Sequence, residues 1–371
     1  MLLHLLWDEK ITHRIIKTFD EVFPGENEYV YWFAHSNERH FTQEGDHLHV
    51  LYDYSSDPDI DYHRVSKVII HGLDFDKIQF CCRNIPAHVP VYWILWGAEL
   101  YNNLLFNRGY RLYYKSRPKL SLKAGLGLFL KRFGLLSKND KFKLDFFNTR
   151  NVTMVCGSGE YDLFRSYYPK ETRTLLNETE FFYYPIDEVL GEELLRSKAE
   201  GNIILIGNSA SWTNNHEYVF DHIKNLDLKG KQIVVPLNYG GDAAYRDKIT
   251  RLGDKYFGSN CSSLSKFLPL SEYNSLMAKA EVCIYGSWRQ EAMGNIVVAL
   301  YLGAKVFMSG KSPLYEDLTG RGLIIFKLED ITQESLDTPL SRMQKDNNRK
   351  ILVSSNSWER LKEITYNLFK S

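Results

Sequence analysis

The sequence predicts an α/β protein made of two Rossmann-like halves. Short apolar runs that end in glycine or in a polar turn recur along the chain at intervals long enough to hold a helix. Strands separated by helix-length gaps are typical of a mostly parallel sheet. The pattern continues through all 371 residues, a length sufficient for two domains of ordinary size.

In the first half, the apolar runs predict six strands and one clear early helix. The helix is expected over residues 12–23, where apolar side chains recur at helical spacing. Adjacent Cys81 and Cys82 are expected to end a further buried strand. The predicted strands cover residues 2–6, 29–34, 49–52, 68–71, 90–96 and 152–156.

The second half shows the same alternation more cleanly. Strands are expected over 202–207 and 232–236, and the stretch 283–307 predicts a strand, a loop, a buried helix and a strand. Helices are expected up to about 225, over 242–252, over 271–279 and over 357–368. We therefore predict an N-terminal domain at 1–185, a C-terminal domain at 186–355 and a terminal helix at 356–371.

Composition excludes several classes of protein. Lys and Arg balance Asp and Glu at 46 each, so no global charge indicates nucleic acid as a partner. Five cysteines without C-x-x-C spacing favour neither a disulfide framework nor a zinc site. The N-terminus lacks the basic segment of a signal peptide, and no apolar run approaches the ~18 residues of a spanning helix. A reducing cytoplasm fits this composition.

The loop after the 283–287 strand is the strongest candidate for a binding site. It carries Arg289, Gln290, Gly294 and Asn295 where an apolar helix begins. Free backbone N–H groups and the positive end of the dipole make a helix start an anion site. An arginine and an amide beside it predict a phosphate-bearing ligand that is held without a metal, and no cofactor is expected.

A second strand-end loop, 207–216, offers more polar groups of the same kind. Gly207 permits close approach of the backbone, while Asn208, Ser209, Asn214 and His216 supply hydrogen bonds, with His216 able to turn cationic near a diphosphate. The alternative is that Asn214 or Asn215 caps the next helix. The loop lacks the G-x-x-x-x-G-K-[ST] pattern, which excludes a P-loop. It also lacks the G-x-G-x-x-G pattern, which disfavours a nicotinamide dehydrogenase.

Two further loops contain candidates for ligand binding and catalysis. In the loop after 232–236, Tyr239 is placed to stack on a base or a sugar. Glu99 follows the 90–96 strand, where desolvation by tryptophans would raise its pKa and suit it to act as a general base. The alternative is that Glu99 caps its own helix. Asp8 and His13 are rival bases, and His71, also near a strand end, is more simply a core histidine.

One segment, 108–143, differs from the rest in charge. It holds eleven Lys and Arg residues against a single acid, Asp140, with leucines and phenylalanines between them. A basic amphipathic segment of this kind is typical of a helix lying on anionic lipid, with Lys123, Lys131 and Arg132 facing the membrane. The alternative is a core helix with a solvated basic side.

Together these loops resemble the bacterial N-acetylfucosaminyltransferase family of enterobacterial common antigen assembly. The matching stretches lie in scattered blocks over residues 90–310, and the likeness is strongest from 202 onwards. They are WGAELY, ILIGNS within GNSASWTNNH, VVPLNYGGDAAY, LSEYNSLMAKAEVCIYG and RQEAMGN. The chain departs from the family pattern at Glu291-Ala292, where the family's turn is richer in glycine, and in the expanded basic segment.

The resemblance implies the GT-B fold, in which two Rossmann-like domains face each other across a cleft. It implies an inverting, metal-independent transfer of a deoxyamino sugar such as N-acetylfucosamine from a dTDP- or UDP-linked donor. The implied acceptor is a polyprenyl-diphosphate-linked saccharide at the cytoplasmic face of the inner membrane, where the enzyme would be peripheral. A pyruvyl-transferase-like or epimerase-like GT-B protein and a non-catalytic partner of the same pathway remain alternatives.

Overall fold

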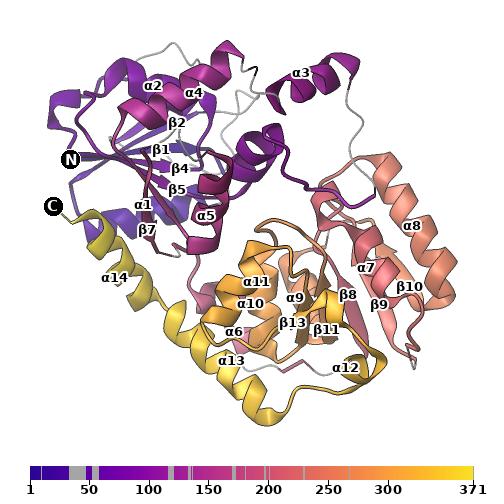
Figure 1. Ribbon diagram of the computed structural model, residues 1–371. Coiled ribbons are helices and arrows are strands. Elements are labelled where there is room, and N and C mark those ends of the chain that lie inside the picture. Colours follow the sequence, from indigo (N-terminus) through magenta and orange to yellow (C-terminus); the bar gives the residue numbers. More distant parts are fainter. Residues whose placement is uncertain are drawn as a thin grey trace. The chain divides into compact units, whose positions relative to one another are not determined.

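The computed structural model describes residues 1–9, 11–32, 47–51, 58–115, 121–132, 135, 137–168, 173–179, 181–195, 198–199, 201–228, 230–266 and 268–370. The chain forms two compact units (Figure 1). Unit 1 comprises Met1–Tyr110, Ser121–Tyr184 and Trp358–Ser371, and unit 2 comprises Arg111–Leu120 and Pro185–Ser357. Neither unit is continuous in sequence, whereas the sequence predicts continuous domains and a separate terminal helix.

Unit 1 is built on a seven-stranded sheet with the order β3-β2-β1-β4-β5-β6-β7, and all its strand pairs are parallel. The strands are β1 (Leu2–Trp7), β2 (Asn27–Trp32), β3 (Leu48–Leu51), β4 (Lys67–His71), β5 (Val91–Ile94), β6 (Val152–Cys156) and β7 (Leu175–Glu178). The helices are α1 (Thr12–Val22), α2 (Phe75–Asn84), α3 (Leu122–Arg132), α4 (Lys138–Thr149), α5 (Ser158–Tyr167) and α14 (Trp358–Phe369), with a π-helix at Glu99–Leu105.

The core of unit 1 follows from the alternation of side chains along its strands. Leu2, Leu6 and Tyr31 point to one face, where they pack against α1 and α14. On the other face Trp93 of β5 contacts the rings of Phe147 and Phe164, which α4 and α5 supply. Helix α14 packs on α1, and the two helices together cover one face of the first sheet.

Unit 2 repeats this design with a six-stranded parallel sheet, ordered β10-β9-β8-β11-β12-β13. The strands are β8 (Ile203–Ile206), β9 (Gln232–Pro236), β10 (Cys261–Leu264), β11 (Ala280–Tyr285), β12 (Lys305–Met308) and β13 (Phe326–Lys327). The helices are α6 (Ile186–Leu195), α7 (His216–Ile223), α8 (Ala243–Phe257), α9 (Leu270–Ala278), α10 (Met293–Leu302), α11 (Pro313–Gly320), α12 (Gln333–Asp337) and α13 (Arg342–Ser355).

Both faces of the second sheet are covered, which explains its almost continuous apolar strands. Leu205 of β8 faces the cluster that holds α6, α10 and α13, while Ile204 and Ile206 face α7 and α8. Residues Ile296 to Leu302 of α10 are all buried. The loop that precedes α10 is thereby held on a fixed element.

Most predicted elements are confirmed, including β6 and β9 at their predicted bounds. The prediction for Cys81 and Cys82 is wrong, because both lie on α2. That helix starts at Asp74, whose carboxylate accepts hydrogen bonds from the N–H groups of Asp76 and Lys77. The sequence did not predict three edge strands, which are β7, β10 and β13.

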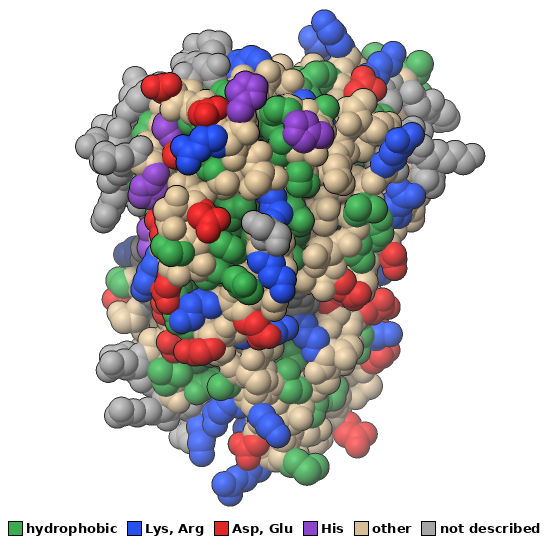
Figure 2. All heavy atoms as spheres, turned by 90° about the vertical axis from the view of Figure 1, so that its left-hand side faces the viewer, with side chains coloured by type: hydrophobic (Ala, Val, Ile, Leu, Met, Phe, Trp, Pro, Cys, Tyr) green, Lys and Arg blue, Asp and Glu red, His purple; other side chains and the backbone are tan. Residues whose placement is uncertain are grey.

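The surface reflects the balanced charge of the chain. On the face that Figure 2 shows, Lys and Arg side chains are interspersed with Asp and Glu side chains. Within the described part of the chain, no helix is both long and apolar enough to cross a membrane.

Candidate functional site

Each sheet has one place where the strand order reverses. In unit 1 it lies between β1 and β4, and in unit 2 between β8 and β11. In open α/β sheets, ligands bind outside the carboxyl ends of the strands at such a switch point. The loops that follow these four strands are therefore the first places to look for a site.

The loop after β8 is folded around the side chain of Asn214. Gly207 has φ +70°, and a Cβ there would lie 2.6 Å from Asn214 Oδ1 and 2.8 Å from His216 Nε2, so only glycine fits. Asn214 Oδ1 accepts from the Asn208 N–H at 3.0 Å, and its Nδ2 donates to Ser209 Oγ at 3.1 Å. Five of the predicted donor-binding residues are thus brought together in one loop.

Asn215 occupies the N-cap position of α7, as the capping alternative proposed, but its side chain makes no capping hydrogen bond. Asn215 instead adopts a left-handed conformation with φ +49°. Its Nδ2 donates to the Leu112 carbonyl at 3.1 Å, and its Oδ1 accepts from the Tyr114 N–H at 2.9 Å. These bonds attach the chain segment at 111–115 to unit 2.

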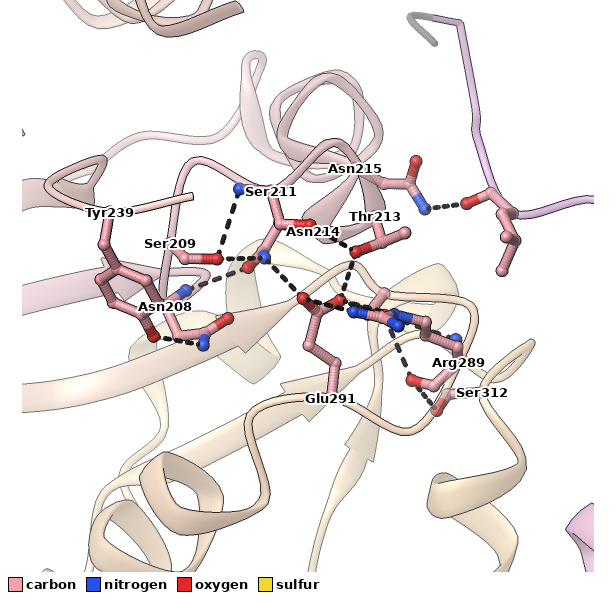
Figure 3. A network of polar contacts seen from close by, with 12 residues as sticks. Asn208, Ser209, Ser211, Thr213, Asn214, Asn215, Tyr239, Arg289, Glu291 and Ser312 are labelled. Carbon is pink, nitrogen blue, oxygen red and sulfur yellow. Dashed lines mark hydrogen bonds and ion pairs between the residues drawn. The ribbon is translucent and has the colours of Figure 1, made fainter. Parts of the chain in front are cut away.

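Glu291 joins the loop after β8 to the loop after β11 (Figure 3). Its carboxylate accepts from Thr213 Oγ1 at 2.7 Å, Asn214 Nδ2 at 3.4 Å and Ser287 Oγ at 3.1 Å. It also binds both Nε and Nη2 of Arg289, at 3.3 and 3.1 Å. An ionised carboxylate offers about four lone-pair sites, so these contacts use its full capacity. Sequence reasoning noted Glu291 only as a departure from a family pattern.

Arg289 is fixed by this ion pair and by its own backbone. Its side chain is 12% exposed and that of Glu291 is 10% exposed. The Arg289 carbonyl accepts from Ser312 Oγ at 3.2 Å. A two-point guanidinium–carboxylate pair of this kind is strong and directional. The charge of Arg289 is therefore compensated, which the sequence did not indicate.

Other positive groups lie next to this pair. The Lys311 ammonium lies 4.1 Å from the ring centre of Trp288, and the Arg111 guanidinium lies 5.1 Å from it. Lys311 and Arg111 are both exposed. Trp288 precedes Arg289 in the chain, so this neighbourhood carries a net positive charge although Arg289 itself is paired.

The first turn of α10 presents its N–H groups as predicted. No side chain caps the helix, whose N-cap Ala292 is left-handed with φ +64°. At Gly294 nothing lies within 4 Å of where a Cβ would be. Asn295 is engaged elsewhere, since its Nδ2 donates to the Tyr273 hydroxyl at 2.9 Å. The open space beside Gly294 leaves room for a ligand to approach the helix start.

Two buried acceptors near these loops have no hydrogen-bond partner, Asn208 Oδ1 and Gln290 Oε1. Buried polar atoms are nearly always paired, so these two acceptors are available to donor groups of a ligand or of water. Asn208 also donates through Nδ2 to the Tyr239 hydroxyl at 2.9 Å. The Tyr239 side chain is 49% exposed, which leaves its ring accessible for the predicted stacking.

His216 cannot play the cationic role considered from the sequence. It is fully buried, and burial lowers its pKa to about 3, so it is neutral. Its Nδ1 lies 3.0 Å from the Tyr245 hydroxyl, and its Nε2 faces Gly207. His216 therefore packs against the loop at Gly207 and offers no positive charge to a ligand.

In unit 1, Glu99 anchors a loop. Its Oε1 accepts from the Trp96 N–H at 2.8 Å and from the Trp93 indole at 3.2 Å. Burial raises the pKa of Glu99, although these hydrogen bonds oppose the rise. The side chain thus has the predicted desolvated environment. The capping alternative is not met, because Trp96 precedes the helix and no side chain caps its start.

The other two base candidates flank the connection between β1 and α1. Asp8 follows β1 directly and is half-buried at the switch point, whereas His13 is exposed in the first turn of α1. His71 is a buried core histidine: its Nδ1 lies 3.1 Å from the Tyr183 hydroxyl and its Nε2 lies 3.3 Å from His4 Nδ1. Burial holds its pKa well below the ordinary value.

The predicted membrane-facing residues lie on α3. Lys123 is exposed, Lys131 forms an ion pair with Asp140 at 3.0 Å, and the side chain of Arg132 lies outside the described residues. Large apolar side chains of this region are also exposed, with Leu126 at 60% and Phe129 at 57%. The alternative of a core helix is not supported, because no described side chain of α3 is buried.

A family model described as 4-alpha-L-fucosyltransferase, glycosyl transferase group 56, matches residues 137–363, more than half of the chain. The chain belongs to this family. The fucosyltransferase relationship inferred from the strand-end loops is thereby confirmed, and the protein is a glycosyltransferase.

Solved structures show the fold of this group 56 glycosyltransferase. WaaG, a glycosyltransferase involved in lipopolysaccharide biosynthesis, matches at 10% identity and a TM-score of 0.57, covering 100% of both chains. Anabaena HepE in complex with UDP and glucose matches at 12% identity and 0.61, covering 99% of each. Sucrose-phosphate synthase from Thermosynechococcus elongatus matches at 12% identity and a TM-score of 0.59, covering 99% of this chain and 98% of the synthase chain. The predicted GT-B fold with two parallel-sheet domains is confirmed.

Proposed function

We propose that this group 56 glycosyltransferase moves a deoxyamino sugar, such as N-acetylfucosamine, from a nucleoside-diphosphate donor to a polyprenyl-diphosphate-linked saccharide. Unit 2 would hold the donor and unit 1 the acceptor. The observation that carries this proposal is the Glu291–Arg289 pair with Asn214, placed beside the uncapped start of α10 at the β8/β11 switch point.

The polar groups of unit 2 match the parts of such a donor. The N–H groups near Gly294 and the positive charge of Lys311 suit the diphosphate. The unmet acceptors of Asn208 and Gln290 suit sugar hydroxyls or the N–H of a pyrimidine base. HepE, which shares the fold, was solved with UDP and glucose bound, and this supports a UDP- or dTDP-linked donor here.

The transfer follows from these placements. The acceptor hydroxyl oxygen attacks the anomeric carbon, the bond from that carbon to the diphosphate oxygen breaks, and the diphosphate leaves with the electron pair. Arg289, Lys311 and the helix dipole would stabilise the charge that develops on the leaving group without a metal ion. Attack from the face opposite the diphosphate inverts the anomeric configuration, through an oxocarbenium-like transition state.

The proton of the acceptor hydroxyl goes to a base in unit 1, for which we favour Asp8. Asp8 lies at the carboxyl end of β1, at the switch point of its sheet. Glu99 is the second candidate. Its side chain is 8% exposed and already accepts hydrogen bonds from Trp96 and Trp93, so it is less accessible to an acceptor hydroxyl. The exposed His13 is the third.

With a lipid-linked acceptor, we expect the enzyme to act at the cytoplasmic face of the inner membrane as a peripheral protein. Support comes from the exposed apolar and basic side chains of α3, among them Leu126, Phe129 and Lys123. WaaG, which shares the fold, is itself involved in lipopolysaccharide synthesis.

Product analysis tests the proposal. The enzyme is incubated with dTDP- and UDP-linked deoxyamino sugars and a polyprenyl-diphosphate saccharide, and the lipid product is analysed by mass spectrometry and by NMR of the new linkage. We expect one added sugar with inverted configuration, and undiminished turnover in the presence of a chelator. Absence of product with every donor, together with no thermal shift from dTDP or UDP, would contradict the proposal.

A further inference from the structure

A basic pocket lies in unit 1 beside the end of α3. It is small and open to solvent, and its lining contains the cations Arg108, Lys131 and Lys143 and the single acid Asp140. Asp140 is engaged in capping α4, because its carboxylate accepts from the N–H and the hydroxyl of Ser137. Within the lining the cations therefore outnumber the acid, and the carboxylates of Asp74 and Asp76 also act on Lys143 from outside it.

The cations of this pocket are held by their surroundings. The Arg108 guanidinium lies 4.8 Å from the ring centre of Tyr168, and the Lys143 ammonium lies 5.9 Å from that of Phe75. Lys131 is held by its ion pair with Asp140. Burial lowers the pKa of Lys143, so a bound anion would relieve the cost of its charge.

An exposed apolar stripe runs along the helix that ends at this pocket. Leu126, Phe129 and Leu130 are spaced three and four residues apart, so they share one face of α3, and they are 60%, 57% and 38% exposed. Leu130 directly precedes Lys131, whose ammonium lies in the pocket lining. Exposed apolar side chains and one cation of the pocket, Lys131, thus lie next to each other on α3.

We propose that this pocket binds the phosphate of an anionic glycerophospholipid whose acyl chains lie against the apolar stripe of α3. The inference rests on the membrane role proposed above and gives it a defined headgroup site. Charge complementarity selects an anionic lipid, since three cations face one acid. The adjoining stripe selects a lipid over free phosphate, because only a lipid also covers Leu126 and Phe129.

A soluble lipid isolates the pocket from the general charge of a membrane surface. The probe is monomeric dihexanoyl phosphatidylglycerol, titrated into the full-length enzyme by calorimetry. We expect saturable binding that weakens at least about tenfold in the Arg108→Gln/Lys143→Gln variant. The matched control is Lys138→Gln/Lys141→Gln, which removes the same charge from exposed positions on α4 outside the pocket lining and leaves the affinity unchanged. No saturable binding, or equal losses in the two variants, would overturn the proposal.

Folding and the source of the phosphate are controlled separately. The single variant Lys143→Gln serves if the double variant melts at a lower temperature than the parent, and it too should weaken binding. Farnesyl diphosphate is titrated in parallel as a soluble form of the acceptor's lipid diphosphate. Tighter binding of farnesyl diphosphate, in competition with phosphatidylglycerol, would overturn the phospholipid assignment and give the pocket to the acceptor.

Vesicles separate the failure of this inference from failure of the proposed membrane role. The enzyme should float with phosphatidylcholine vesicles that contain phosphatidylglycerol, and not with phosphatidylcholine alone. Leu126→Ser/Phe129→Ser should abolish flotation and also weaken binding of the soluble lipid, whose acyl chains lose the apolar stripe, while the weaker binding should still be saturable. If the enzyme floats but the soluble lipid does not bind, the pocket site is wrong and the membrane role stands. If neither occurs, both are wrong.

Discussion

The two sheets reverse their strand order in the same way, but the loops at the two switch points are chemically different. In unit 1 the edge is aromatic, because the ring centres of Trp7 and Trp96 lie 5.4 and 5.8 Å from the ammonium of the fully buried Lys77. The indole of Trp7 donates to Asp74 at 2.7 Å, and that of Trp96 donates to Tyr183 at 2.7 Å. In unit 2 the edge consists of small polar side chains and one ion pair.

The difference lies in how completely each edge satisfies its own polar groups. The Lys77 ammonium donates to the carbonyls of His71 and Gly72 at 2.9 and 2.7 Å, so the unit 1 edge is internally bonded. The unit 2 edge leaves Asn208 Oδ1 and Gln290 Oε1 buried without partners. One topology thus supports an aromatic edge and a polar edge with two unpaired acceptors, and such acceptors fit the donor site proposed above.

The largest expected effect tests whether the unit 1 edge contributes the base. Asp8→Asn should lower kcat by about a hundredfold or more while leaving the donor KM unchanged, since a general base acts in the chemical step. Single-turnover kinetics at saturating donor measures this. The matched control is Glu99→Gln, whose amide oxygen can still accept from Trp96 and Trp93, and which should cost less than about tenfold. A larger loss in Glu99→Gln than in Asp8→Asn would move the base to Glu99.

The second effect tests whether the ion pair of unit 2 is more than a structural link. Arg289→Ala should weaken donor binding at least about tenfold, or 1.4 kcal/mol, measured by titration with dTDP or UDP. It should also lower the free energy of unfolding by about 3 kcal/mol, because Glu291 is left charged and nearly buried.

The double variant Arg289→Met/Glu291→Gln separates the two roles of Arg289. Removing both charges should recover most of the stability, because no unpaired carboxylate remains. Donor affinity should stay low if the guanidinium binds the diphosphate. Recovery of affinity in the double variant, or a loss below tenfold in Arg289→Ala, would show that the diphosphate assignment is wrong.

The sequence was sufficient for the elements whose apolar pattern is strong. The buried strands β1, β4, β8 and β11 were found because parallel strands covered on both faces are continuously apolar. The short edge strands β7, β10 and β13 were not assigned, because half of their surface is open and their pattern is mixed. Glycines at strand ends located the loops correctly.

The details of the site were harder to predict because they depend on contacts between distant segments. Glu291 receives bonds from Thr213 and Asn214, 78 and 77 residues away in sequence, and no local pattern indicates this. The burial of His216 depends on its packing against Tyr245 of another helix. Residue type and loop position thus identified the candidates, while pairing and burial determined what each can do.

The third effect compares the acid sensitivity of the two units. Burial lowers the pKa of His4 to about 3 and that of His71 well below its ordinary value, whereas unit 2 contains His216 at about 3. The unfolded chain binds these protons at a pKa of about 6.5, so between about pH 6 and pH 4 the unfolded state holds more protons. Stability is therefore present above the unfolded pKa and falls as the pH drops.

In that range each buried histidine should lower the free energy of unfolding by about 1.4 kcal/mol per pH unit as the pH falls. Unit 1 has two such histidines, His4 and His71, and unit 2 has His216, so unit 1 should lose stability about twice as steeply from this cause. Hydrogen exchange of the β1 and β8 amides, corrected for intrinsic rates, measures the two slopes. His71→Gln should bring the slope of unit 1 close to that of unit 2. Unchanged slopes in that variant would contradict the assignment.

The smallest effect on stability comes from glycines in the polar loops of unit 2, where two positions should respond in opposite ways. Gly207→Ala should destabilise the protein by about 1–3 kcal/mol, because φ is +70° and the new Cβ would meet Asn214 Oδ1. Gly294→Ala should stabilise it by about 0.5–1 kcal/mol, because Gly294 is helical and its Cβ would enter open space. The same methyl should nevertheless weaken donor binding, since it fills the space through which a diphosphate would reach the first turn of α10. Thermal unfolding and dTDP or UDP titration of the two variants measure both quantities. A Gly294→Ala enzyme that is more stable and binds nucleotide as well as the parent would remove the helix start from the donor site, leaving only the Arg289 side of the polar edge.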